Sequence, residues 1–249
     1  GRPVMGGKKP ALPSAAISHP QVSDEFDAPA LAPQWQWNHN PVDEAWSLAA
    51  RPGWLCLKGQ AAANLELARN TLTQKLWGQG GSFEVKLDAA ALNDGQRAGA
   101  AFMSGKFFTA VGVERRGGAT RFYWEDYVAA PPGTPPANPP LPGQATAGPA
   151  IASGPVWLRG EYHGDTARLG YSTDGTTFTD TGLEVKLRFS QWKGARLALF
   201  STGSAAYNAS VSLRAGVPEL LVTSNLAGLA LNLPEPFDKP AEALLPLRL

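Results

Sequence analysis

The sequence has a single cysteine among its 249 residues, and this scarcity excludes several kinds of stabilising and functional element. Cys56 lies in the apolar alternation of residues 54–57, which predicts a buried thiol. With one thiol, no disulfide can form within the chain and no cysteine cluster can bind a metal ion. The fold must therefore depend on a packed core, for which the chain is long enough.

Charge and long apolar runs are also scarce. Charged residues make up 17% of the chain and the formal net charge is +1, so nucleic acid is not an expected partner. No apolar run reaches the roughly 18 residues that a membrane-spanning helix needs, so no membrane partner is expected either. Glycine (27) and proline (22) are abundant instead, which favours short strands joined by many turns.

Catalytic motifs are missing as well. The three histidines, His19, His39 and His163, do not have the spacing of metal ligands. There is no Gly-x-Ser-x-Gly, phosphate-binding loop or dinucleotide fingerprint. Most acidic residues lie at turns or alternate outward on predicted strands, where solvated carboxylates are the default. The sequence therefore predicts no catalytic residue in this chain.

The only cofactor considered is a structural calcium ion, which requires oxygen ligands. Asp24 and Asp27, the first acids of the predicted domain, can supply them. The late segment 207–211 contributes only amide and hydroxyl oxygens. A calcium site at Asp24 and Asp27 is therefore one expectation, and a chain without any cofactor is the other.

Strand-like alternation dominates from Trp46 onward, and 82–88 is its clearest case, with Phe83, Val85 and Leu87 on one face. Turn residues lie where hairpins need them, at 116–118 and 172–175. This pattern predicts an all-β fold, a two-sheet antiparallel sandwich of jelly-roll or concanavalin A-like type. The predicted strands are 54–58, 64–67, 71–76, 82–88, 98–103, 109–115, 120–127, 156–162, 167–171, 177–179, 183–187, 195–200 and 209–214.

Composition divides the chain into three parts. Residues 1–23 are punctuated by glycine and proline and are predicted to be an inter-domain linker. The sandwich is predicted over 24–223, with a proline-rich insertion at 129–155 that is not expected to form a β-ladder because proline removes donors. The leucine-rich extension 224–249 is expected to pack on the sandwich or on a partner.

The stretch 34–41 concentrates aromatic and amide side chains. On a strand, Trp35 and Trp37 share one face because side chains alternate. Two interpretations stay open: the indoles fill a core, or they stack on a sugar ring. In the second case Asn38, His39 and Asn40 are candidates for hydrogen bonds to sugar hydroxyls, so all five residues are candidate substrate contacts.

A second stretch, 68–74, is expected to be the partner of the first. Alternation puts Arg69, Thr71 and Thr73 on one face and Asn70, Leu72 and Gln74 on the other. An arginine beside aligned hydroxyls can dock a partner surface or a sugar, and it can equally belong to a cross-strand ladder. The candidate docking residues are Arg69, Asn70, Thr71, Thr73 and Gln74.

These stretches, with 46–48 and 51–53, resemble the C-terminal β-sandwich of glycoside hydrolase family 43, which contains β-xylosidases and α-L-arabinofuranosidases. The similarity continues through 94–99, 111–113, 171–175 and 194–200 and covers about 24–214. It implies a catalytic β-propeller as partner, on the same or another chain, and xylan- or arabinoxylan-type plant polysaccharide as substrate. It also implies a sandwich loop that reaches the propeller's pocket, for which 35–40 is the candidate.

By this resemblance the chain is an accessory, non-catalytic domain that supports a propeller. Two alternatives remain. The chain could be a free-standing carbohydrate-binding module with an exposed tryptophan platform, or a purely structural module that only stabilises its partner.

Overall fold

The computed structural model describes residues 6–8, 11, 21–128, 143–152, 154–190, 193–203, 207–214, 217–224 and 247–248, the last three ranges by their backbone. Most of the expected linker, 129–142 and 153 of the expected insertion, and 225–246 and 249 of the C-terminal extension therefore lie outside the described residues. Within the described part, the only helix is the short 3-10 turn η1 (Asp43–Ala45). No helix there is long and apolar enough to cross a membrane.

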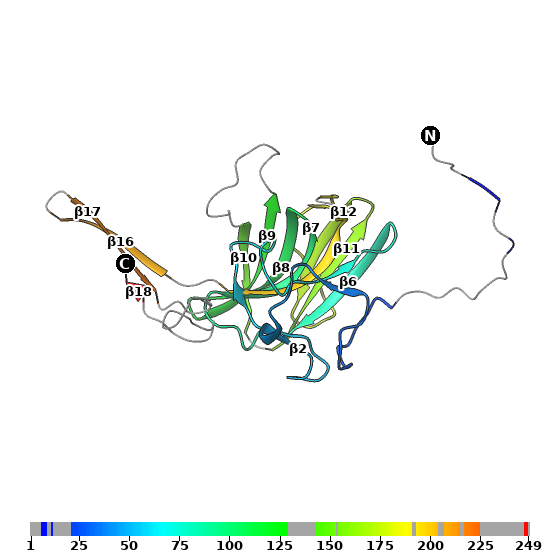
Figure 1. The fold of residues 1–249 in the computed structure, drawn as a ribbon, viewed down its shortest axis with the longest axis horizontal. Coiled ribbons are helices and arrows are strands. Elements are labelled where there is room, and N and C mark those ends of the chain that lie inside the picture. The colour runs from blue at the N-terminus through cyan, green and yellow to red at the C-terminus, as the bar shows by residue number, and fades with distance from the viewer. Residues whose placement is uncertain are drawn as a thin grey trace.

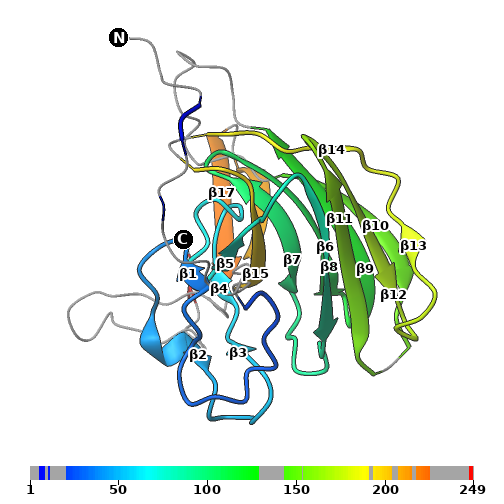
Figure 2. The same cartoon turned by 90° about the vertical axis from the view of Figure 1, so that its right-hand side faces the viewer.

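The larger sheet has eight strands, and its path runs β1-β5-β15-β7-β8-β9-β10 with β4 paired to β15. Apart from the parallel pair of β4 and β15, its neighbouring strands are antiparallel. The first strand of the chain, β1, lies at one edge of this sheet and pairs with β5 (Figure 2). Its strands are β1 (Trp35–Trp37), β4 (Gln60–Ala61), β5 (Leu72–Lys75), β7 (Gln96–Ser104), β8 (Phe107–Arg116), β9 (Ala119–Val128), β10 (Gln144–Ala150) and β15 (Arg196–Gly203).

A five-stranded sheet faces the larger one, with β11 contacting β7 and β12 contacting β8 (Figure 2). It is built of β6 (Gly80–Leu87), β11 (Val156–His163), β12 (Thr166–Ser172), β13 (Thr179–Asp180) and β14 (Val185–Lys186). Two small sheets complete the described part, formed by β2 (Trp46–Ser47) with β3 (Cys56–Leu57), and by β16 (Tyr207–Arg214), β17 (Val217–Ser224) and β18 (Leu247–Arg248). The predicted all-β sandwich is confirmed (Figure 1).

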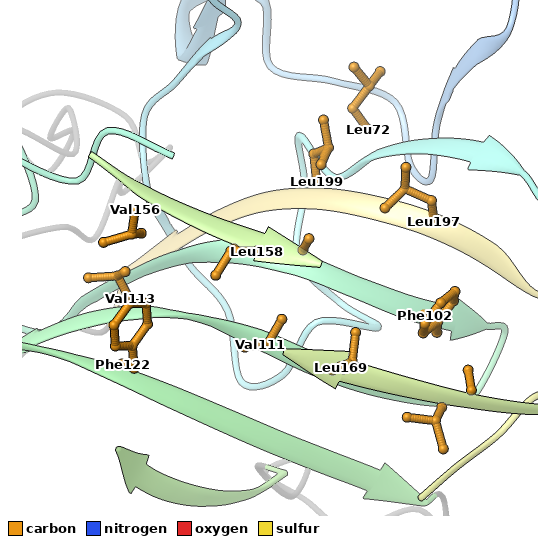
Figure 3. Packing of buried hydrophobic residues seen from close by; sticks show 13 residues of the cluster. Leu72, Phe102, Val111, Val113, Phe122, Val156, Leu158, Leu169, Leu197 and Leu199 are labelled. Atoms are coloured by element: carbon orange, nitrogen blue, oxygen red, sulfur yellow. The ribbon is translucent and has the colours of Figure 1, made fainter. Parts of the chain in front are cut away.

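The core lies between the two sheets, because each strand turns alternate side chains inward. The smaller sheet contributes Val156, Leu158 and Leu169, which meet side chains such as Phe102 and Val111 of the larger sheet (Figure 3). In β6 the predicted alternation is confirmed. Its apolar residues 83, 85 and 87 pack against this core, while 82, 84 and 86 are exposed.

Two strand predictions are wrong for identifiable reasons. Residues 64–67 form a turn, in which Asn64 Oδ1 and the Asn64 carbonyl both accept the N–H of Leu67. Asparagine favours such local hydrogen bonds over a β-ladder. The insertion was expected to carry no ladder, yet β10 lies inside it and pairs with β9. Proline is tolerated there because β10 is an edge strand and its register shifts between Ala147 and Ala150, around Pro149.

The predicted hairpin turn at 116–118 joins β8 and β9, and Gly117 and Gly118 both have positive φ angles, as such a two-residue turn requires. The other predicted turn follows β12 and is built around Asp174. The Asp174 carboxylate accepts the N–H of Thr177 at 2.8 Å and of Thr176 at 2.7 Å, and the hydroxyl of Ser172 at 2.9 Å. These hydrogen bonds hold the pKa of Asp174 well below its ordinary value of 3.8.

Because of this turn, we expect the stability of the folded protein to depend on pH. Because the pKa of Asp174 is lower in the folded than in the unfolded chain, its carboxylate stabilises the fold above about pH 4, and this contribution is lost as the pH falls further. Asp174→Asn should therefore melt at a lower temperature than the wild type near neutral pH, and the difference should shrink toward about pH 2. Thermal unfolding followed by circular dichroism measures this. A difference that does not change with pH would contradict it.

Candidate functional site

The two sequence stretches adjoin in the structure. In the register of β1 and β5, Trp35 lies opposite Gln74 and Trp37 lies opposite Leu72. The pairing continues beyond β1, where the N–H of Asn38 donates to the carbonyl of Thr71 at 2.9 Å. The stretches are thus neighbouring segments at one edge of the larger sheet, which is where the candidate site is built.

The two indoles share a face, as alternation predicts. Each is partly buried and packs against the core cluster. The Trp35 ring lies 5.5 Å from Phe26 and the Trp37 ring 5.1 Å from Trp46, measured between centroids. The Trp35 Nε1–H also donates to Asp24 at 2.8 Å. The indoles therefore join the first strand to the segments on either side of it, and their stacking on a sugar stays a prediction.

Asp24 has both carboxylate oxygens engaged within the chain. Oδ2 accepts the indole N–H of Trp35, and Oδ1 accepts the backbone N–H of Phe26 at 2.8 Å. Asp27 is exposed. Among the described residues, no group of three or more His, Cys, Asp or Glu side chains could hold a metal ion. The calcium site at Asp24 and Asp27 stays a prediction, and any such ion would require further oxygen ligands.

Asn70 is the most constrained polar residue of the site. It is 1% exposed and has a φ of +56°, a left-handed conformation that asparagine adopts more readily than most residues. Its Nδ2 donates to the carbonyl of Val42 at 2.9 Å, and its Oδ1 accepts the N–H of Val42 at 3.0 Å. The side chain therefore binds the backbone that follows the first stretch as a neighbouring strand would.

The other polar residues of the second stretch are also used internally. Thr71 Oγ1 donates to the carbonyl of Ala68 at 3.1 Å, and Gln74 Nε2 donates to the carbonyl of Val22 at 2.9 Å. Thr71 is fully buried and Gln74 is 6% exposed, whereas Arg69 is exposed. Of the five candidate docking residues, Arg69 alone is exposed.

Arg196, at the start of β15, binds the outward side of β1. Its Nη1 donates to Gln36 Oε1 at 2.8 Å and to Thr73 Oγ1 at 3.2 Å. Thr73 Oγ1 in turn donates to the carbonyl of Gln36 at 2.8 Å. The exposed Lys75 is the register partner of Arg196, so the two cations lie side by side on neighbouring strands.

Two further cations contact Asn38 and Asn40, the alternate residues that follow Gln36 in the first stretch. Lys193, from the loop before β15, donates from Nζ to Asn38 Oδ1 at 3.2 Å. Arg69 donates from Nε and Nη2 to the carbonyl of Asn40, at 3.1 and 2.8 Å. We name these four residues the cationic rim: Arg69, Lys75, Lys193 and Arg196. Within the described residues, none of the four forms a salt bridge.

His39 completes the first stretch. Its Nε2 donates to the carbonyl of Glu66 at 2.6 Å, which ties the stretch to the turn before Arg69. His39 and Asn40 are exposed, whereas Asn38 is partly buried. Sequence reasoning selected Arg69 but missed Lys75, Lys193 and Arg196. No local pattern marks these three, because only the strand order brings them to one edge.

A separate polar cluster lies on the outer face of the larger sheet. Arg97 binds Glu114 through Nη2 at 3.1 Å and Glu125 through Nη1 at 3.0 Å, and its guanidinium lies over the Tyr123 ring. Both glutamates are 7% exposed, so the expectation of solvated strand carboxylates is wrong for them. Burial raises the pKa of Glu125, although the charge of Arg97 opposes this shift. Since one arginine binds both carboxylates, the cluster is an ion network within the sheet.

Comparison with known proteins places this fold among glycosidase domains. The family described as the beta xylosidase C-terminal concanavalin A-like domain matches residues 23–212. A beta-xylosidase of Formosa agariphila is 32% identical over 224 residues, which cover 81% of this chain and 35% of that protein. A putative beta-xylosidase of Xylanibacter ruminicola is 39% identical over 117 residues, 47% of this chain and 21% of that protein.

Solved structures agree. A GH43 glycoside hydrolase engineered to show both endo-xylanase and exo-arabinofuranosidase activity superposes with a TM-score of 0.65 at 25% identity, over 77% of this chain and 40% of that one. A bifunctional GH43-CE protein of Bacteroides eggerthii gives a TM-score of 0.62 at 25% identity, over 73% of this chain and 23% of that one. The chain thus spans at most about a third of the curated relatives it matches here.

Proposed function

The chain belongs to the family of beta xylosidase C-terminal concanavalin A-like domains, and from this membership we propose that it is the accessory sandwich of a xylan- or arabinoxylan-cleaving glycosidase. The match over residues 23–212 carries the proposal, because it covers both opening stretches and most of the described strands. Membership confirms the resemblance to family 43 that those stretches indicated.

In this proposal the work is divided between two domains. A catalytic β-propeller supplies the carboxylates that perform acid–base glycoside hydrolysis, and the sandwich supports it. The first strand and the residues after it are held by hydrogen bonds from Asn70, Arg196, Lys193 and Arg69, so their exposed groups have fixed positions. His39 and Asn40 are the exposed polar members of this stretch, and we propose that they lie nearest to the substrate pocket.

The contacts of the indoles favour this supporting role over a free-standing sugar-binding module. A sugar-binding platform needs an exposed aromatic face. Trp35 and Trp37 are instead partly buried against the core, with Phe26 and Trp46 beside them. The amides and cations at the edge are likewise engaged with one another, which orders a surface rather than leaving open hydroxyl-binding groups.

The proposal is tested by a native mass measurement on the protein isolated from the cells that produce it. We expect a species well above 26.3 kDa that contains a propeller-type glycosidase, either in the same polypeptide or as a second one. The 249-residue chain alone should release no product from aryl-xyloside or aryl-arabinofuranoside. A lone monomer that binds xylo-oligosaccharides, followed by tryptophan fluorescence, would instead identify a free-standing module.

A further inference from the structure

The cationic rim forms no salt bridge in the described part of the sandwich. Its side chains donate hydrogen bonds to Gln36, Asn38, Thr73 and the carbonyl of Asn40, all neutral groups. Three arginines elsewhere, Arg51, Arg97 and Arg159, each bind a carboxylate at 2.7–3.2 Å, whereas other described cations, such as Arg116, also form no salt bridge. We propose that the rim docks a carboxylate-bearing surface of the domain that precedes this sandwich in its relatives. The inference rests on the proposed function and names the surface through which the two domains meet.

The path of the chain places a preceding domain at this edge. The chain enters the sandwich beside β1 and β5, where the carbonyl of Val22 accepts from Gln74 and the carboxylate of Asp24 accepts from Trp35. In the relatives this domain is C-terminal, and the region matched here is 35% of the Formosa agariphila protein, so a large part of that protein precedes it. We therefore expect that part to join the sandwich next to the rim.

The surroundings of the rim fit a contact between domains. Two exposed apolar side chains adjoin the edge of the sheet that carries the rim. Val22 is 50% exposed, and its carbonyl accepts a hydrogen bond from Gln74. Leu67 is 45% exposed and lies in the turn just before Arg69. Interfaces between domains of one chain combine apolar contacts with a large share of polar ones. Cations that form no salt bridge within the described sandwich can add the charge complementarity that selects one orientation and discourages other partners.

The geometry also prepares the rim for binding. Arg196 and Arg69 are anchored by hydrogen bonds to Gln36, Thr73 and Asn40, so ordering them costs little entropy when a partner arrives. Planar guanidinium groups bind carboxylates in a bidentate manner and with defined direction. Lys75 is exposed beside Arg196, and its side chain forms no hydrogen bond to the other described residues, so it adds charge to the rim.

The test measures binding between two purified proteins by calorimetry. One is the full 249-residue chain, and the other is the remainder of the Formosa agariphila beta-xylosidase, expressed without the region that matches this chain. The variants are Lys75→Glu and Arg69→Glu. Arg116→Glu is the matched control, because Arg116 is exposed at the β8–β9 turn, several strands from β1. Circular dichroism checks that each variant and the truncated beta-xylosidase fold, and binding is measured only between folded proteins.

We expect the wild type to bind, more weakly as salt is raised, and each rim variant to bind about tenfold more weakly or worse, with the control unchanged. Binding by the wild type that is equally strong in Lys75→Glu and Arg69→Glu would overturn the role of the rim and leave the proposed function standing. No binding by any form would overturn the proposed function together with the rim. Retention of the chain on a uronic-acid-bearing xylan, without binding to the protein, would assign the rim to polysaccharide and overturn the inference.

Discussion

Replacement of Asn70 by alanine is expected to lower the free energy of unfolding by about 2–4 kcal/mol. The side chain of Asn70 is 1% exposed, and its amide binds both backbone groups of Val42. Alanine therefore leaves the N–H of Val42 without its partner, whereas the carbonyl of Val42 keeps only the N–H of Ala45, at 3.0 Å. Alanine also tolerates the left-handed backbone at φ +56° poorly. Denaturant unfolding of the wild type and the variant measures the loss.

Two control variants separate the hydrogen bonds from the backbone conformation. Asn70→Gly relieves the conformational cost but loses both bonds, so it should remain strongly destabilised. Asn70→Asp retains the acceptor for the N–H of Val42 and loses the donor to its carbonyl, so it should fall between glycine and the wild type. A glycine variant as stable as the wild type would show that the bonds to Val42 contribute little.

Replacement of Trp35 and Trp37 together by alanine is expected to prevent stable folding. Truncation of a large buried aromatic costs about 3–5 kcal/mol, and domains of this kind are stable by roughly 5–15 kcal/mol in total. These two rings are only partly buried, so the cost of removing each lies near the lower end of that range. Both rings nevertheless pack on the core, and the alanine variant also loses the hydrogen bond from Trp35 to Asp24. Near-ultraviolet circular dichroism and limited proteolysis report the loss of packing.

The double variant with phenylalanine at both positions is the matched control. It keeps an aromatic ring at each position and should fold. Its free energy of unfolding should be moderately lower than that of the wild type, because the indole N–H is missing and the ring is smaller. The same experiment decides between the interpretations of the first stretch. An alanine double variant that stays folded but no longer binds xylan would contradict the packing role and support the sugar platform.

Much of the fold was predictable because strands and hairpin turns produce patterns among residues that are close together in the sequence. In β6 the period of two in residues 82–88 identifies both the strand and its buried face. Glycine pairs and Asx turns mark hairpins at 116–118 and 172–175 for reasons that involve only neighbouring residues. The failures at 64–67 and at β10 have tertiary causes or involve side-chain bonds to the backbone, which a period of two does not reveal.

For the site, the sequence by itself determined the two stretches, their aromatic and amide composition and their family, because these depend on residues adjacent in the chain. Only the tertiary structure decided the rest. The strand order places β15 beside β5, and this brings Arg196 to Gln36 and Lys75 across more than a hundred residues of chain. It also buries Glu114 and Glu125 around Arg97, although each alternates as a solvent-facing residue would. Side-chain alternation says which face a residue takes, but strand order and sheet curvature decide what that face meets.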